Sequence, residues 1–216
     1  QAQNEGRIVQ YSSASKDESL NFVRLASGSL GGKARGLAFA NNLLSESNMT
    51  DAYPTMELRV PKVAVIGTDE FDLFMDENEL WKTAFSKKKS DKSIMKTFLK
   101  GKLSKALIQT LSKYLSKVKY PIAIRSSSLL EDSQYQPLAG MYATYMLPNS
   151  DKSKSERLDQ LMKAIKLVYA STYLKEPKSL IENSAHRHEE EKMAVIIMEL
   201  IGKKHGDRFY PSVSGS

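Results

Sequence analysis

Residues 121–128 read Pro-Ile-Ala-Ile-Arg-Ser-Ser-Ser, and this stretch decides the fold. A proline opens it, three apolar residues follow, and a polar run then continues from Ser126 to Pro137. This pattern is typical of a short buried strand followed by a loop. Binding sites of α/β proteins are usually built where such strands end. Arg125, at the end of the strand, is therefore the first candidate for a functional side chain.

Long amphipathic segments lie on both sides of this strand. Upstream, we expect one helix from Ser93 to Val118, weakened in its middle by Gly101. Its apolar stripe consists of Leu99, Leu103, Leu107, Leu111, Leu115 and Val118. Downstream, we expect a second helix over residues 156–174. Its apolar stripe consists of Leu158, Leu161, Ile165, Val168 and Tyr169.

Further strands and helices complete the pattern. Residues 7–27 are weakly patterned and are expected to lead into the domain, and a glycine-rich turn follows at residues 28–33. We then expect a helix to about Ser45, with Leu37, Ala40 and Leu44 on one face. The other expected elements are strands over 59–66, 142–147 and 193–201 and a short acidic helix over 69–81. Buried strands mixed with helices predict an α/β (α+β) fold.

The composition is that of an ordinary globular protein. Hydrophobic residues make up 41% of the 216 residues and charged residues 26%, which argues against general disorder. The chain has no cysteine, so a disulfide framework and a thiolate metal site are excluded. Apolar runs such as residues 194–198 are far too short to span a bilayer, and the N-terminus lacks the pattern of a secretory signal. We therefore expect a cytoplasmic location and no membrane partner.

The net charge of +7 is concentrated in one segment. Residues 82–119 contain 12 lysines and a single acid, Asp91, so this segment alone carries +11. Such a surface could bind nucleic acid or another anion, although a solvated helix face is the more common explanation. The segment has almost no arginine and few aromatic residues, which argues against base readout or stacking. A nucleic-acid- or anion-binding module is the alternative hypothesis for function.

Residues 31–36 form a glycine-rich motif, Gly-Gly-Lys-Ala-Arg-Gly. Glycines let the backbone approach an anion closely, and the following helix offers amide donors and the positive end of its dipole. Lys33 adds a full positive charge. The motif is not a Walker A loop, because Ser27 stands where that loop needs glycine and Ala34 where it needs serine or threonine. Taken alone, the motif is more often a plain loop-to-helix turn with a solvated lysine.

Arg125 and the residues after it form a second motif. A guanidinium at a strand end can hold phosphate oxygens with two parallel hydrogen bonds. The three hydroxyls of residues 126–128 could donate further hydrogen bonds. In the alternative, Arg125 pairs with Glu131 or Asp132 and the serines cap a helix.

The third motif is Pro-Leu-Ala-Gly-Met-Tyr-Ala-Thr at residues 137–144. Gly140 allows a tight backbone approach before a strand, and Thr144 offers a hydroxyl. Taken in order, Gly-Gly-Lys-x-x-x-Leu, Arg-Ser-Ser-x-x-x-Glu-Asp and Ala-Gly-x-x-x-Thr resemble a known family. It is the N-terminal nucleotide-binding region of phosphoenolpyruvate synthase and pyruvate phosphate dikinase.

The resemblance extends from about Leu30 to Gly215. Residues 193–201 are similar to the strand that leads into the family's adenine-binding hinge, and residues 211–215 to the start of its next strand motif. The resemblance implies a variant ATP-grasp fold, in which two subdomains close on the nucleotide. The chain would then be truncated before the second subdomain is complete. Its expected parts are a lead-in over 1–27, the N-terminal ATP-grasp-like subdomain over 28–192, and the first strand of the second subdomain over 193–216.

The same resemblance implies a set of residues for ATP. They are Lys33 and Arg125 on the phosphates, in a catalytic role, Gly140 and Thr144 on a loop that covers the phosphates, and Glu199 and Ile201 at the adenine hinge. Met198 stands where the family often has glutamine, so a side-chain contact from this position is not assigned. The acidic residues that hold Mg²⁺ in this family are expected beyond Ser216, and no metal ligand is assigned within the chain.

The function that the resemblance implies is a phosphotransfer. The full-length parent would cleave ATP and phosphorylate a histidine on a separate domain, which passes the phosphoryl group to a small acceptor such as pyruvate. Phosphohistidine and acceptor-substrate domains of the same protein are the expected partners, and this fragment alone would be inactive. A catalytically degenerate family member with a regulatory role is a further alternative. The family also phosphorylates glucans and an antibiotic, so the acceptor stays open.

Two other clusters have structural explanations. His186 and His188 precede three glutamates at 189–191, and these side chains can ligate metals. Adjacent charges on an exposed loop are far more often solvated, because a metal site needs converging geometry. The tyrosines among apolar positions are expected in the core rather than on a base-stacking surface. They are Tyr142, Tyr145, Tyr169 and Tyr173.

Overall fold

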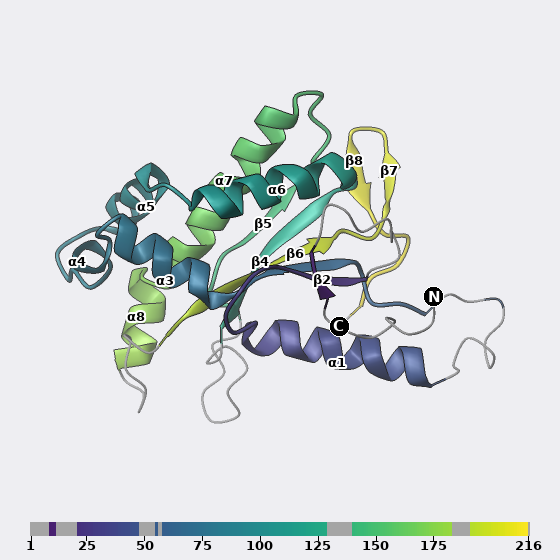
Figure 1. Cartoon of the computed structure of the whole chain (residues 1–216), viewed down its shortest axis with the longest axis horizontal. Coiled ribbons are helices and arrows are strands. Elements are labelled where there is room, and N and C mark those ends of the chain that lie inside the picture. The colour runs from purple at the N-terminus through teal and green to yellow at the C-terminus, as the bar shows by residue number, and fades with distance from the viewer. Residues whose placement is uncertain are drawn as a thin grey trace.

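A six-stranded sheet with helices on both faces forms the body of the protein (Figure 1). The computed structural model describes residues 9–11, 21–47, 55, 58–128, 140–182 and 191–215. The strands are β1 (Val9–Gln10), β2 (Phe22–Ala26), β3 (Val63–Ile66), β4 (Ile122–Ser128), β5 (Thr144–Leu147), β6 (Met193–Glu199), β7 (Lys203–His205) and β8 (Arg208–Tyr210). The helices are α1 (Gly31–Glu46), α3 (Thr68–Glu77), α4 (Trp81–Ala84), α5 (Asp91–Lys100), α6 (Lys105–Lys117), α7 (Lys154–Ser171) and α8 (Lys175–Glu182). The predicted α/β class is confirmed.

The sheet is mixed and has the strand order β1-β2-β3-β6-β4-β5. β1, β2 and β3 are parallel, whereas β6 runs antiparallel to β3 and β4, and β5 runs antiparallel to β4. β3 is buried along its whole length, and so are the first five residues of β6. Such continuous burial is expected for strands covered on both faces. The domain boundary at residue 193 stays a prediction, and β6 belongs to the same sheet as β3 and β4.

The two faces of the sheet are covered unequally (Figure 1). Successive side chains of a strand point to opposite faces. Ile122 and Ile124 of β4 contribute to the larger core, which also contains side chains of α3, α5, α6 and α7. Ser127, of the opposite parity, bonds to α1. Among the described helices, α3, α5, α6 and α7 therefore lie on one face and α1 lies on the other.

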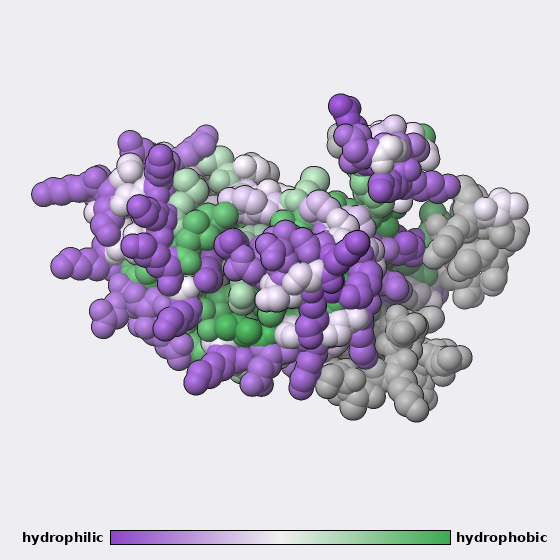
Figure 2. All heavy atoms as spheres, turned by 90° about the horizontal axis from the view of Figure 1, so that it is seen from above, coloured by the Kyte–Doolittle hydropathy of each residue, from purple (hydrophilic) through white to green (hydrophobic). Residues whose placement is uncertain are grey.

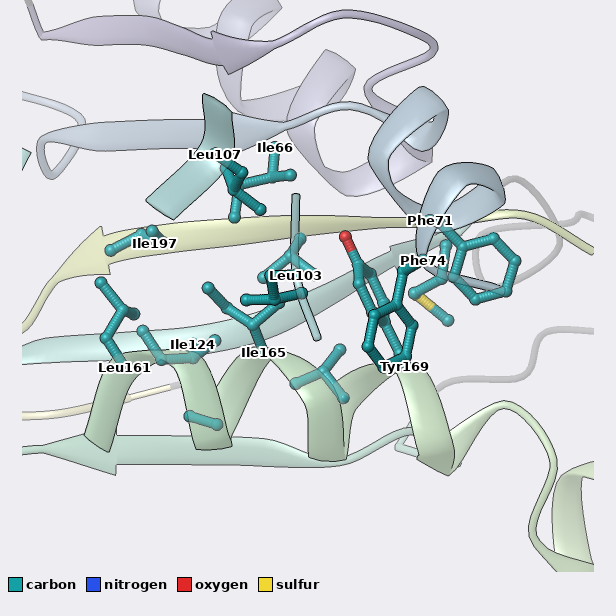
Figure 3. Close-up of a cluster of buried hydrophobic side chains, with 14 of the residues drawn as sticks. Ile66, Phe71, Phe74, Leu103, Leu107, Ile124, Leu161, Ile165, Tyr169 and Ile197 are labelled. Atoms are coloured by element: carbon teal, nitrogen blue, oxygen red, sulfur yellow. The ribbon is translucent and has the colours of Figure 1, made fainter. Parts of the chain in front are cut away.

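The larger core is rich in aromatic side chains (Figure 3). The ring of Tyr169 on α7 lies 5.2 Å from that of Phe71 and 5.5 Å from that of Phe74, between ring centroids. Figure 3 shows Ile165 of the same helix pointing toward the sheet, and Ile197 of β6 farther along the same core. All five side chains are fully or almost fully buried. Aromatic pairs at such distances add stability beyond the area they bury, about 1 kcal/mol per pair.

The core under α1 is smaller. Its buried members are Phe22, Leu30, Ala34, Val60, Val63, Val65 and Ile196. Leu37, Ala40 and Leu44 of α1 pack against them, as the sequence pattern predicts. Phe39 and Leu43, on the other side of α1, are exposed.

The helix expected from Ser93 to Val118 is wrong, because two helices occupy this segment. α5 ends at Lys100, and Gly101 takes an extended backbone conformation. Ser104 then caps α6, since its hydroxyl accepts a hydrogen bond from the Leu107 amide at 3.0 Å. The continuous leucine stripe hides this break, and Leu99, expected on the stripe, is 37% exposed. The remaining stripe positions are buried.

Other boundaries also differ from the sequence predictions. The acidic helix expected over 69–81 ends at Glu77, because Glu79 adopts a left-handed conformation with φ of 51°. The segment expected as a lead-in contains β2, whose residues alternate between the two cores. β3 begins only at Val63, and β5 only at Thr144. β7, β8 and α8 were not predicted from the sequence.

The central elements agree with the predictions. Ile122 to Ile124 are buried in β4, and residues 193–197 of β6 are buried as well. The helix expected over 156–174 is α7, which Ser153 caps by accepting a hydrogen bond from the Glu156 amide. The predicted burial of the tyrosines is confirmed for Tyr142, Tyr169 and Tyr173, and Tyr145 packs partly buried against the same core. In the part of the chain that the structure describes, no helix is both long and apolar enough to cross a bilayer.

Candidate nucleotide site

The N-terminus of α1 is joined to the end of β4 by one buried hydroxyl. The Ser127 hydroxyl donates a hydrogen bond to the Leu30 carbonyl at 2.7 Å and accepts one from the Ala34 amide at 3.1 Å. These two backbone groups would otherwise form the first hydrogen bond of the helix. The Ser127 side chain therefore fixes where α1 begins relative to the strand that carries Arg125.

Gly31 makes this junction possible. Its φ is +75°, and a Cβ atom at this position would lie 1.8 Å from the Ser127 carbonyl oxygen. No other residue type fits without moving the backbone. Gly31 thus serves the close packing of α1 on β4, which differs from the role in anion approach predicted for it.

A second pair of hydrogen bonds holds the turn before α1. The Ser29 amide donates to the Thr68 hydroxyl at 2.9 Å, and the Thr68 amide donates to the Ser29 carbonyl at 3.0 Å. The Ser29 hydroxyl accepts from the Gly31 amide at 3.4 Å. The first amides of a helix have no partner within the helix. Between the bonded amides of Gly31 and Ala34, the Gly32 amide is a donor that this turn can offer to an anion.

Lys33 and Arg125 both lie near the junction that Ser127 forms between β4 and α1. Lys33 is in the first turn of α1 and is half-buried. Arg125 is half-buried in β4, two residues from Ser127 and therefore on the face that α1 covers. Two residues of a strand span about 7 Å. Both cations that the sequence analysis selected therefore lie within a few residues of one junction, and their joint role in binding phosphate stays a prediction.

Thr144 joins this group through strand pairing. Its position in β5 is directly opposite Arg125, and residues directly opposite in an antiparallel pair share a face. Thr144 is exposed. Gly140 is also exposed, with φ of +78°, and no atom of the described residues lies within 4 Å of a Cβ built on it. The free space around Gly140 leaves its backbone accessible on one side.

Glu199 and Ile201 lie at the other end of β6. Glu199 pairs with Ile122, three residues from Arg125 along β4, which corresponds to about 10 Å. Its carboxylate accepts hydrogen bonds from the Arg59 guanidinium at 2.8 Å and the Lys62 amide at 3.2 Å. Ile201 follows the end of β6 and is 47% exposed. The structure therefore places these two residues apart from the cation group.

Electrostatics around Glu199 favour its charged form. Burial by itself raises the pKa of this carboxyl, but the hydrogen bonds from Arg59 and the Lys62 amide outweigh it, so the pKa lies below the ordinary value. Arg59 and Glu199 form an ion pair at the sheet end. Glu199 is thus already engaged by neighbours in the chain.

The serines after Arg125 differ from their prediction. The sequence analysis placed residues 126–128 in a loop with hydroxyls available to a ligand, but all three continue β4 and are buried. Ser127 uses both its donor and an acceptor on α1. It fits the alternative in which a serine caps a helix. The proposed pairing of Arg125 with Glu131 or Asp132 lies outside the described residues.

The histidine-glutamate cluster falls largely outside the described residues as well. His186, His188 and the first two glutamates belong to that part. Glu191 is described, and its prediction as a solvated loop residue is wrong, because it is buried and accepts a hydrogen bond from the Tyr142 hydroxyl at 2.9 Å. Among the residues that the structure describes, no three His, Asp or Glu side chains converge as a metal site would require.

Sequence reasoning missed the residues that position the site. Thr68 and Ser127 act through single hydroxyls, and Gly31 acts through its lack of a side chain. The available signal was a glycine pair directly before a helix together with a serine after a buried strand. That combination indicates a close helix–strand contact only when the two segments are known to be neighbours.

Comparison with known proteins identifies a nucleotide-binding family for the chain. The family model described as pyruvate phosphate dikinase, AMP/ATP-binding domain, matches residues 27–215. The match includes all three motifs and every candidate site residue. No curated protein matches the chain. Because the match covers nearly the whole chain, the protein belongs to the pyruvate phosphate dikinase AMP/ATP-binding domain family.

Proposed function

We propose that Lys33 and Arg125 hold the phosphates of ATP in a reaction that phosphorylates a histidine on a separate domain. The observation that supports the proposal is the junction formed by the buried Ser127 hydroxyl, which bonds to the first turn of α1, where Lys33 lies, two residues after Arg125 in β4. Membership of an AMP/ATP-binding domain family is the reason for proposing ATP as the ligand. The phosphoryl group would then pass to a small acceptor such as pyruvate.

The chemistry asked of these residues is mainly positioning and charge stabilisation. An arginine stays charged and can form two parallel hydrogen bonds to phosphate oxygens. Lys33 adds a compact charge beside the Gly32 amide and the positive end of the α1 dipole. Thr144, opposite Arg125, is suited to donate a hydroxyl hydrogen bond. Gly140 would bring backbone over the phosphates.

The adenine end of the site is proposed near the end of β6. Residues 198–201 would bind the base through backbone groups, with Ile201 providing exposed apolar surface. Glu199 would contribute only if a ligand competes with Arg59 and Lys62 for its carboxylate. The separation of about 10 Å along the strands suits an extended nucleotide with its base and phosphates at opposite ends.

The rest of the reaction would need groups that are proposed to lie in other parts of a longer protein. Magnesium would neutralise phosphate charge, and its ligands are proposed beyond Ser216. A second ATP-grasp subdomain would form the other wall, and phosphohistidine and acceptor domains would complete the transfer. A version of the protein extended through the second wall is expected to bind ATP clearly more tightly than this chain, and equal affinity would contradict the two-walled arrangement. A cytoplasmic location is part of the proposal.

Calorimetry with ATP tests the role of Lys33. Lys33→Ala is expected to weaken ATP binding by about ten-fold or more, because it removes a charge-assisted contact to phosphate. Lys105→Ala is the matched control, since Lys105 is an exposed lysine in the first turn of α6. Equal affinities of the two variants would contradict the proposal.

A further inference from the structure

A cavity of about 220 Å³ lies beside the larger core, whose members Ile94 and Tyr173 help to line it. It is lined by residues before and at the start of α5 and by the beginning of α8. Four of its nine lining residues are lysines, namely Lys87, Lys89, Lys175 and Lys178. The candidate ATP residues are not among those that line it. The cavity is therefore a separate feature of the fold.

Hydrogen bonds in the chain hold this cavity together. The Lys175 amide donates to the Asp91 carboxylate at 3.0 Å, which joins the start of α8 to the start of α5. The Lys178 ammonium donates to the Ser86 carbonyl at 3.4 Å. The Lys89 ammonium donates to the Thr83 hydroxyl at 2.8 Å. Two helix starts and the segment before α5 thus converge around one space.

The electrostatics of the lining favour an anion. Four lysines and one acid, Asp91, line the cavity, so the lining has a formal charge of +3. The positive dipole ends of α5 and α8 lie at the same place. Like charges gathered at a concave surface raise the local concentration of counter-ions. Ser86 and Ser179 also line the cavity, and the Ser179 hydroxyl donates to the Glu176 carbonyl at 2.9 Å.

We propose that this lysine-lined cavity binds a small phosphate-bearing anion, separately from the ATP site. The lysines before α5 and at the start of α8 would surround the phosphate. Bound anion would reduce the repulsion between lysines on α8 and lysines before α5. It would therefore fasten α8 to the rest of the domain.

A concave site favours a small anion over a nucleic acid. All 12 lysines of residues 82–119 are exposed, and Figure 2 shows hydrophilic side chains reaching outward at the end that carries α4 and α5. A nucleic-acid backbone would use many of these lysines and would show little dependence on any two. The cavity is instead lined by Lys87 and Lys89 together with two lysines of α8, and these two pairs lie far apart in the sequence.

Titration with inorganic phosphate at constant ionic strength, followed by backbone amide NMR, tests the proposal. The amides at the starts of α5 and α8 are expected to shift with saturation. The double variant Lys89→Gln with Lys175→Gln is expected to weaken phosphate binding by about ten-fold or more. The matched control, Lys105→Gln with Lys113→Gln, removes the same charge from exposed positions of α6 and should leave the affinity unchanged.

The outcomes separate the cavity from its alternatives. Lys33→Ala should not alter these amide shifts, so failure of the ATP proposal would leave this one standing. Equal weakening by both double variants would overturn the proposal in favour of general charge attraction. Shifts absent from the two helix starts would also overturn it. A single-stranded oligonucleotide provides the last comparison. If it binds more tightly than phosphate, and if both double variants weaken its binding to the same extent, the lysines serve nucleic-acid binding instead.

Discussion

The two faces of the sheet differ in the size of their cores and in the polar groups that they carry. The face under α3, α5, α6 and α7 is filled by aromatic and aliphatic side chains, and its centre is completely buried. The face under α1 has a small core, and its strands carry a half-buried arginine and an exposed threonine in register. Stability thus resides mainly on one face, which leaves the other free to carry polar groups near a ligand.

On the α1 side, single groups fix the position of the helix on the sheet, whereas on the other side many contacts do so. One serine hydroxyl and one glycine fix the helix to the strand there, whereas the opposite core shares its packing among many residues. Removal of one contact should therefore have sharper consequences at the α1 junction. The predictions below test this contrast.

The largest effect is expected from Gly31→Ala. The added Cβ would meet the Ser127 carbonyl oxygen at 1.8 Å, and the residue would be held at φ of +75°. We expect a loss of about 3 kcal/mol or more in the free energy of unfolding. Chemical denaturation measures it.

Gly36→Ala is the matched control in the same helix. A Cβ at Gly36 has nothing within 4 Å, and the residue lies inside α1. Alanine there should raise the free energy of unfolding by up to about 1 kcal/mol. If Gly31→Ala were as well tolerated as Gly36→Ala, the close junction of α1 with β4 would be wrong.

A smaller effect is expected from the buried tyrosines of the larger core. Tyr142→Phe removes a buried hydrogen bond to the Glu191 carboxyl, at 2.9 Å, and should cost about 1–3 kcal/mol. The Tyr169 hydroxyl is buried and has no hydrogen-bond partner among the described residues. Burial raises the pKa of Tyr169 and keeps its ring neutral. Tyr169→Phe should therefore be neutral or stabilising by up to about 1 kcal/mol.

Thermal unfolding of both tyrosine variants provides the comparison. The expected order of melting temperatures is Tyr142→Phe lowest and Tyr169→Phe equal to or above the unmodified chain. A marked loss with Tyr169→Phe would show that its hydroxyl has a partner that matters for stability. It would also weaken the view that this face depends on packing.

The smallest effect concerns acid and Glu199. The pKa of Glu199 is lower in the folded state than its ordinary value of 4.5, so ionised Glu199 stabilises the folded state at pH values above 4.5. This contribution is lost as the pH falls from there through the lowered pKa. The ion pair with Arg59 is partly exposed, so it should be worth less than about 1 kcal/mol.

Denaturation at pH 7 and pH 3 measures this contribution. Glu199→Gln should be slightly less stable than the unmodified chain at pH 7, and the difference should be smaller at pH 3. A difference of the same size at both pH values would indicate a packing effect instead of an ion pair.

Much of the architecture could be predicted from the sequence because it rests on periodicity. The strand at 122–124, the strand from Met193 and the helix that became α7 all carry clear apolar patterns. The break at Gly101 could not be predicted, because the leucine spacing continues across it. β2 was missed because its residues belong to two different cores, so its apolar pattern can be interpreted only when both faces of the sheet are known.

The candidate site shows the same division. Lys33 and Arg125 could be selected because motif order and residue type point to phosphate. The burial of Ser127 could not be foreseen, since its partners are more than 90 residues away in the sequence. The ion pair that engages Glu199 joins segments 140 residues apart. Contacts across such separations need the fold before they can be named.

Arg125→Ala, with ATP affinity and melting temperature measured on the same variant, tests the central claim most directly. The account predicts an ATP affinity lower by about ten-fold or more with little change in melting temperature, because Arg125 is held for a ligand. Arg125→Lys should restore little affinity, since an ammonium lacks the planar fork of the guanidinium. In the longer parent, Arg125→Ala should also greatly lower ATP-dependent autophosphorylation. A variant that melts earlier yet binds ATP as tightly as the unmodified chain would contradict the account and make Arg125 a structural residue.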